Sequence, residues 1–247
     1  EEAIRRDDFR ENYPEEEIRK DLAYVVDREK KFTQKDQINE RKSKILEAII
    51  FFQAELNNWF GEGVFTARVS RFDDIAHGTD LVLEFLDEKG LVRIALAIDI
   101  TSAQDEATLK NKLLSIKKGV ESGKLTDVKY FKSEADQSRM RLRNIPRLLV
   151  VINNNTLHEL IELSLNKDRE RLRKHQIQRI ILEELYKQLI HYFWFSKEGN
   201  PLIAEKFQEA MKLIQPILDS KRDIRIDYEK DNSVALIEGL VDEVFPI

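Results

Sequence analysis

Two aspartates, Asp80 and Asp99, have the residue type and spacing of a metal site. They lie at the outer ends of two β-type runs, residues 79–86 and 91–101, which a polar turn at 87–90 separates. Two such runs joined by a short turn containing Gly predict a β-hairpin. Side chains alternate between the faces of a strand, so any even-length loop leaves both carboxylates on one face. With Lys89-Gly90 as a two-residue loop, Asp80 pairs directly with Asp99.

Neighbouring carboxylates on a sheet need something to offset their repulsion. A shared proton, a basic partner or a divalent cation could do this. Carboxylates combined with carbonyl and water oxygens suit Mg²⁺ or Mn²⁺. The alternative is that both aspartates end their strands in solvent and bind nothing.

Other common catalytic arrangements are missing from the sequence. There is no GxGxxG, no GxxxxGK[ST] and no GxSxG. The four histidines lack the spacing of zinc ligands. The chain has no cysteine, which excludes disulfides, thiolate metal sites and a cysteine nucleophile.

The hydrophobic pattern predicts an α/β protein with the order α-β-β-β-α-β, followed by further helices. Pro216 is expected to kink or end the last helix. Helices are predicted at 14–32, 40–60, 104–121, 156–195 with a break near 166–168, and 200–219; strands are predicted at 64–70, 79–86, 91–101 and 147–153, the last as an interior strand.

Together, this order and the segments Gly78-Thr79-Asp80 and Ile98-Asp99-Ile100-Thr101 resemble the PD-(D/E)XK nuclease superfamily. The resemblance covers roughly residues 40–155. It implies a restriction-endonuclease-like α/β core with a mixed sheet over that range. Residues 1–39 would then form a charged helical extension, and residues 156–247 a helical region packed on the core.

The resemblance also implies site residues and a reaction. Asp80 takes the first metal-ligand place and Asp99 the (D/E) place, and the carbonyl of Ile100 is a further ligand. A glutamate from the first core helix, Glu47 or Glu55, could join them, although either could equally be a plain surface residue. The expected activity is hydrolysis of DNA or RNA phosphodiester bonds with Mg²⁺ or Mn²⁺.

At the motif lysine the chain departs from the family, because Thr101 occupies that place. A threonine hydroxyl can donate a hydrogen bond but supplies no positive charge. Lys110 or Lys112 of the following helix could reach back instead. Lys112 lies about 60° from the apolar Leu109 on the helix surface, beside the expected buried stripe, so it is the favoured candidate. Otherwise the chain is an inactive nuclease-fold module that binds nucleic acid or a protein.

Charge is distributed unevenly along the chain. The overall net charge is −5, but residues 1–17 carry −5, residues 110–147 carry +7 and residues 219–247 carry −4. The basic stretch is expected to contact a nucleic-acid backbone, or else to be an ordinary solvated face. A protein partner or a homodimer stays open. No apolar run approaches the roughly 18–20 residues of a membrane span, and no targeting segment is evident, so a cytoplasmic protein is expected.

Overall fold

A mixed four-stranded sheet organises the protein, and its strand order is β1-β2-β3-β6. The computed structural model describes residues 6–86, 92–102 and 105–247. Neighbouring strands are antiparallel from β1 to β3, and β6 runs parallel to β3. The α/β class and the mixed sheet are therefore confirmed. The four strands are β1 (Val64–Arg68), β2 (Leu81–Leu86), β3 (Val92–Thr101) and β6 (Arg147–Val151).

The β2–β3 register agrees with the predicted hairpin next to the two aspartates. Leu81 pairs with Ile98 and Val82 with Ala97. One further step in this register places Asp80 opposite Asp99. A register shift follows between Phe85 and Leu86. The turn at 87–91, with the expected Lys89-Gly90 loop, lies outside the described residues.

All the predicted helices are present, with different ends. Thr33 and Asp36 form a capping box, so α2 begins six residues before the expected start at 40, and the boundary drawn at 39 falls inside it. The expected break at 166–168 is confirmed, and a second separates α6 from α7. Pro216 does not end its helix. The helices are α1 (Glu15–Glu29), α2 (Gln34–Asn57), α4 (Glu106–Ser122), α5 (Asn154–Leu165), α6 (Arg169–Arg173), α7 (Ile177–Lys197) and α8 (Pro201–Ser220), after a 3-10 turn at Arg6–Phe9.

Four elements were not expected, so the predicted order α-β-β-β-α-β is incomplete. They are α3 (Arg71–His77), β4 (Thr126–Lys132), β5 (Arg139–Ile145) and α9 (Ser233–Val244). β4 and β5 form a separate antiparallel pair within the basic stretch. Most of β5 is polar and exposed, and this weakened the apolar alternation that identifies strands.

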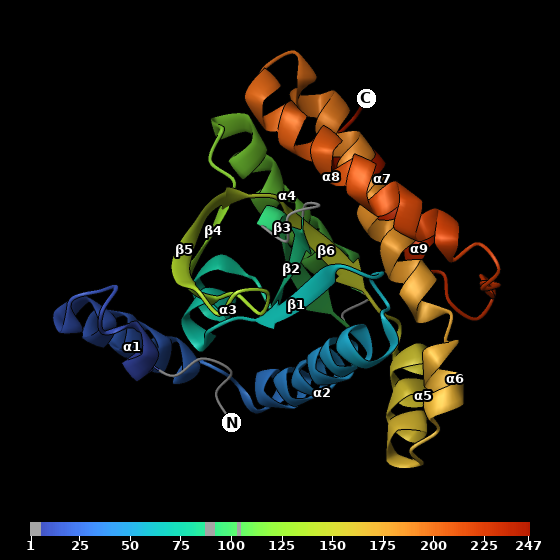
Figure 1. Cartoon of the computed structure of the whole chain (residues 1–247), viewed down its shortest axis with the longest axis horizontal. Coiled ribbons are helices and arrows are strands. Elements are labelled where there is room, and N and C mark those ends of the chain that lie inside the picture. Colours follow the sequence, from blue (N-terminus) through green and yellow to red (C-terminus); the bar gives the residue numbers. More distant parts are fainter. Residues whose placement is uncertain (1–5, 87–91, 103–104) are drawn as a thin grey trace.

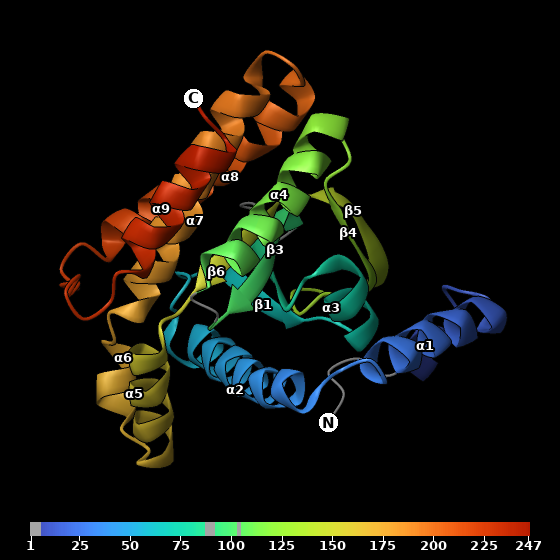
Figure 2. The same ribbon diagram turned by 180° about the vertical axis from the view of Figure 1, so that it is seen from behind.

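Two layers cover the main sheet. Leu81, Leu83 and Ile98 point into the large core shared with the helices. Val82 and Ala97, on the opposite face, pack in a smaller core with residues of β4 and β5. Helices α7, α8 and α9 run together along one side of the molecule, and α2 crosses below the sheet (Figures 1 and 2).

β6 lies at the end of the strand order, although its sequence predicted an interior strand. Its residues are still buried, because α7 covers its outer edge. Gln188 of α7 accepts a hydrogen bond from the Leu149 N–H and donates one to the Leu149 carbonyl, and Glu184 accepts from the Val151 N–H. Buried side chains thus replace a neighbouring strand. None of the described helices is long and apolar enough to cross a lipid bilayer.

Candidate active site

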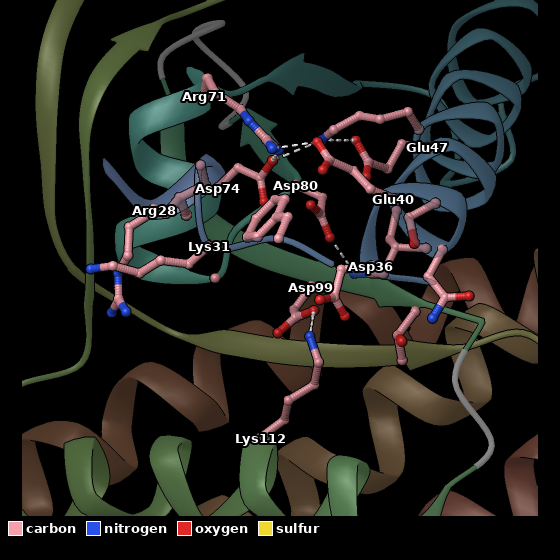
Figure 3. A pocket seen from close by; sticks show the side chains of 18 residues that line it. Arg28, Lys31, Asp36, Glu40, Glu47, Arg71, Asp74, Asp80, Asp99 and Lys112 are labelled. Atoms are coloured by element: carbon pink, nitrogen blue, oxygen red, sulfur yellow. Dashed lines mark hydrogen bonds and ion pairs between the residues drawn. The ribbon is translucent and has the colours of Figure 1, made fainter. Parts of the chain in front are cut away.

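A cavity of about 620 Å³ opens where β2 begins and β3 ends. Its walls come from the end of α1, the first half of α2, α3 and α4. Asp80 and Asp99 lie at its centre, and Glu47, Arg71 and Lys112 surround them (Figure 3). The structure therefore brings the two predicted aspartates to one cavity.

The two aspartates have different partners, which offsets their mutual repulsion. Asp99 is only 3% exposed, and its Oδ1 lies 2.6 Å from the Lys112 ammonium. Asp80 Oδ2 accepts a hydrogen bond of 2.7 Å from the Ile100 N–H. Burial raises the pKa of Asp80 well above its ordinary value, and the negative charges of Glu47 and Asp99 raise it further. Asp80 therefore holds a proton more readily than a solvated aspartate.

The backbone of Ile100 faces Asp80. The Ile98 carbonyl accepts a hydrogen bond from the Asp80 N–H, so Ile98 presents its backbone groups to the β2 side. Residues two apart in a strand face the same way, and the Ile100 N–H does donate to Asp80. The Ile100 carbonyl must then face this side as well, as the resemblance implies for a metal ligand. Thr101, the next residue, is buried and also lines the cavity.

Lys112 reaches the site from α4. Asp105 caps this helix, and Leu109 and Leu113 anchor it in the core, which leaves Lys112 at the margin of the buried stripe. Its side chain is 32% exposed and extends to Asp99 (Figure 3). Lys110 instead pairs with Glu243 of α9. Of the two lysines considered from the sequence, only Lys112 therefore contacts the carboxylates.

Among the helix glutamates, Glu47 lines the cavity and Glu55 does not. Glu47 is 5% exposed, and its Oε2 is 2.8 Å from the Lys44 ammonium. Burial raises the pKa of Glu47, against the lowering effect of Lys44. Glu55 accepts a hydrogen bond from the Thr66 N–H of β1, outside the cavity.

α3 supplies a wall that sequence reasoning missed. Asp74 lies 2.8 Å from the Lys44 ammonium and 2.6 Å from Arg71, which also binds Glu29 of α1. The helix has clear end signals in the sequence. Ser70 caps its start, and Gly78 ends it with a φ of 63°. A seven-residue helix has too few turns to show an apolar period, so only these signals could have revealed it.

Acidic residues at both ends of the chain neutralise part of the basic stretch. Lys129 is only 6% exposed and pairs with Glu17 and Asp21 of the N-terminal segment. Lys110 pairs with Glu243 near the C-terminus. Lys129 is therefore not part of a solvated basic face, whereas Lys110 is exposed and paired, with its side chain 41% exposed.

The donors in the cavity fit a hard divalent cation by type. Glu47, Asp80, Asp99 and the Ile100 carbonyl offer only oxygen, which Mg²⁺ and Mn²⁺ prefer. Within residues 6–86, 92–102 and 105–247, no three His, Cys, Asp or Glu side chains are already grouped as metal ligands. Two of these carboxylates contact lysine ammonium groups instead. A cation would therefore have to compete with those ammonium groups.

Comparisons of this chain with protein-family models, with curated proteins and with solved structures find no match. The chemistry of the cavity is therefore inferred from its own side chains.

Proposed function

We propose that this chain is a metal-dependent nuclease of the PD-(D/E)XK type, with a restriction-endonuclease-like core. The contact of 2.6 Å between Lys112 and Asp99 is the observation that carries the proposal. The motif place held by Thr101 lacks the positive charge that phosphodiester hydrolysis needs. The Lys112 ammonium supplies that charge at the same carboxylate, from the next helix.

Each residue of the cavity has a role in this proposal. Asp80, Asp99 and the Ile100 carbonyl would hold Mg²⁺ or Mn²⁺, with Glu47 beside them. Such a cation lowers the pKa of a bound water and neutralises charge on the phosphate. Lys112 orients the attacking water and offsets the charge that develops on the phosphate oxygens.

Cations on the rim of the cavity would hold the nucleic-acid backbone. Arg28, Lys31, Lys44 and Arg71 line the cavity; Lys44 and Arg71 also pair with acidic side chains of the protein. Such side chains position phosphates without reading bases. Binding should therefore weaken as salt concentration rises.

Cleavage of labelled single- and double-stranded DNA and RNA, with Mg²⁺ or Mn²⁺, tests the proposal. We expect Asp99→Asn and Lys112→Ala to lose cleavage by orders of magnitude. Lys110→Ala is the matched control, because Lys110 lies on the same helix and pairs with Glu243 outside the cavity. Equal small effects of the two lysine variants would show that Lys112 does not replace the motif lysine.

One result would favour the inactive nuclease-fold module instead. That result is a parent protein that binds these nucleic acids or a protein but cleaves none of them with either cation. The observation that supports this second function is that Lys44 contacts Glu47 and Lys112 contacts Asp99, because both ammonium groups occupy carboxylates that a cation would need.

A further inference from the structure

Helix α2 has a second group of apolar side chains beside its buried face. Leu46, Ile50 and Ala54 are buried in the core. About 80–120° around the helix from Leu46, four large apolar side chains are exposed, more than on any other helix in the described part of the chain. They are Ile38 (50% exposed), Ile45 (47%), Phe52 (55%) and Leu56 (74%). Single exposed apolar residues are ordinary, but a contiguous apolar stripe marks an interaction surface.

The stripe has the period of a helix–helix seam. Ile38, Ile45 and Phe52 recur every seven residues, and Arg41, Ala48 and Glu55 form a second seven-residue row beside them. At 100° per residue, the three residues of the first row lie within an arc of about 40° around the helix axis. The stripe from 38 to 56 extends about 27 Å along that axis. An apolar row of this period is typical of a helix that pairs along its length, and the second row has small Ala48 between the charged Arg41 and Glu55.

We propose that this stripe, called the outer α2 face, binds the outer α2 face of a second copy in an antiparallel pair. The two-fold axis passes near Ala48, whose small side chain lets the helices approach. Ile45 lies three residues before Ala48 and Phe52 four residues after it, so each meets the other across the axis. A pair of this kind is isologous, with the same surface on both subunits.

Charge complementarity selects the antiparallel direction. Arg41 lies seven residues before Ala48, and Glu55 lies seven residues after it, on the same side of the helix and both exposed. Glu55 Oε1 accepts the hydrogen bond from the Thr66 N–H, so a contact with Arg41 of the other copy would use Oε2. An antiparallel pair brings Arg41 of one copy opposite Glu55 of the other, twice. A parallel pair would instead bring Arg41 opposite Arg41 and Glu55 opposite Glu55. Like charges at such a seam are unfavourable.

The pair leaves both candidate active sites accessible. Glu47 faces the cavity and lies about 160° around α2 from Ile45 of the outer α2 face, whereas Lys44 lies about 40° from Ala48, at the margin between the two. The pair would therefore leave the Glu47 side of each cavity uncovered. Dimer formation does not depend on the proposed nuclease activity, so the two can fail separately.

Cysteine crosslinking tests both pairing and direction, because the chain has no cysteine of its own. Ala48→Cys, oxidised with diamide, should give a covalent dimer on a non-reducing gel. Ile38→Cys should not, because the two copies of position 38 would lie about 30 Å apart at 1.5 Å per residue. Crosslinking of both variants would show a parallel pair and would overturn the proposal. Crosslinking of neither variant would show that the helices do not pair at Ala48 and would also overturn it.

Sedimentation velocity measures the affinity of the pair. The parent should dimerise with rising concentration, and Phe52→Glu should weaken the dimer at least about tenfold, or about 1.4 kcal/mol. Leu202→Glu is the matched control, since Leu202 is 76% exposed on α8, and it should change nothing. Arg41→Glu should weaken the dimer, and Arg41→Glu with Glu55→Arg should restore it. A parent that stays monomeric at about 100 µM would refute the proposal.

Discussion

Replacing Lys112 by methionine should destabilise the protein in the absence of metal and strengthen its response to Mn²⁺. Methionine keeps most of the side-chain volume but removes the ammonium group. Asp99 would then stay buried, at 3% exposure, without the cation that lies 2.6 Å from it. The carboxyl groups of Asp80 and Glu47, both with raised pKa values, lie in the same cavity.

The size of the loss follows from the burial of the pair. Removing one partner of a fully buried ion pair costs about 3–5 kcal/mol, whereas exposed pairs contribute about 0–1 kcal/mol. The Asp99 side chain is 4% exposed and that of Lys112 is 32% exposed, so the pair is intermediate. We expect the free energy of unfolding to fall by about 2 kcal/mol. For a chain of this size that lowers the Tm by about 4–8 °C.

Thermal unfolding with and without Mn²⁺ is the assay. A cation that binds only the folded protein raises the Tm by linkage. Since the ammonium no longer competes for Asp99, Lys112→Met should show a larger Mn²⁺-induced rise than the parent. Asp99→Asn breaks the same ion pair, but it leaves the partly exposed Lys112 ammonium rather than a buried carboxylate, so without metal it should cost less stability than Lys112→Met; it should also abolish the Mn²⁺ shift.

Lys110→Met controls for the loss of a lysine from α4. Its ion pair with Glu243 is more exposed, at 41% and 56% for the two side chains, so its Tm should change little. The reasoning is refuted if both lysine variants lose the same stability. It is also refuted if Mn²⁺ shifts neither the parent nor Lys112→Met.

Three further changes test the surroundings of the site. The raised pKa of Asp80 keeps this side chain protonated in the folded protein at pH values where the unfolded chain, with its ordinary pKa of 3.8, has lost the proton. The free energy of unfolding therefore falls as the pH rises from 3.8 through the folded pKa. In denaturant melts without metal, Asp80→Asn should therefore match the parent near pH 4 and exceed it at higher pH; equal stability at every pH would contradict this. Gly78→Ala should cost at least about 1–2 kcal/mol, because φ is 63° and the new Cβ would lie 2.8 Å from an Arg147 nitrogen, while Gly199→Ala, with open space around it, should not. Gln188→Leu should lower the free energy of unfolding by about 2–3 kcal/mol, since two backbone groups of β6 lose their buried partner; a Tm equal to the parent's would contradict it.

Local pattern was enough to predict the elements with a strong period and the pairing of the two aspartates. Apolar alternation in 79–86 and 91–101 identified β2 and β3. The facing apolar sides of these runs set the register, because a one-residue slip would turn every apolar side chain to the other face. That register alone put Asp80 opposite Asp99. The helical period also predicted that Lys112 lies beside Leu109, at the edge of the buried apolar stripe of α4.

The sequence pattern did not predict the elements that are short or largely polar. α3 has seven residues, and β5 is largely polar and exposed, so neither has a full apolar pattern. Their identity depends on contacts far along the chain. Asp73 of α3, for example, accepts hydrogen bonds from the Lys129 and Tyr130 N–H groups of β4. Such contacts leave no local period in the sequence.

The sequence by itself determined which residue types could form an oxygen-ligand site and that two of them share a strand pair. Only the tertiary structure decided which charged partners complete it. The choice of Glu47 over Glu55 depends on how α2 lies against β1, and the choice of Lys112 over Lys110 depends on α9, whose Glu243 binds Lys110. A long side chain on a helix can reach several partners, and the elements packed beside the helix determine which partner is within reach. The selection of Glu47 and of Lys112 therefore depends on packing between segments that are distant in the sequence.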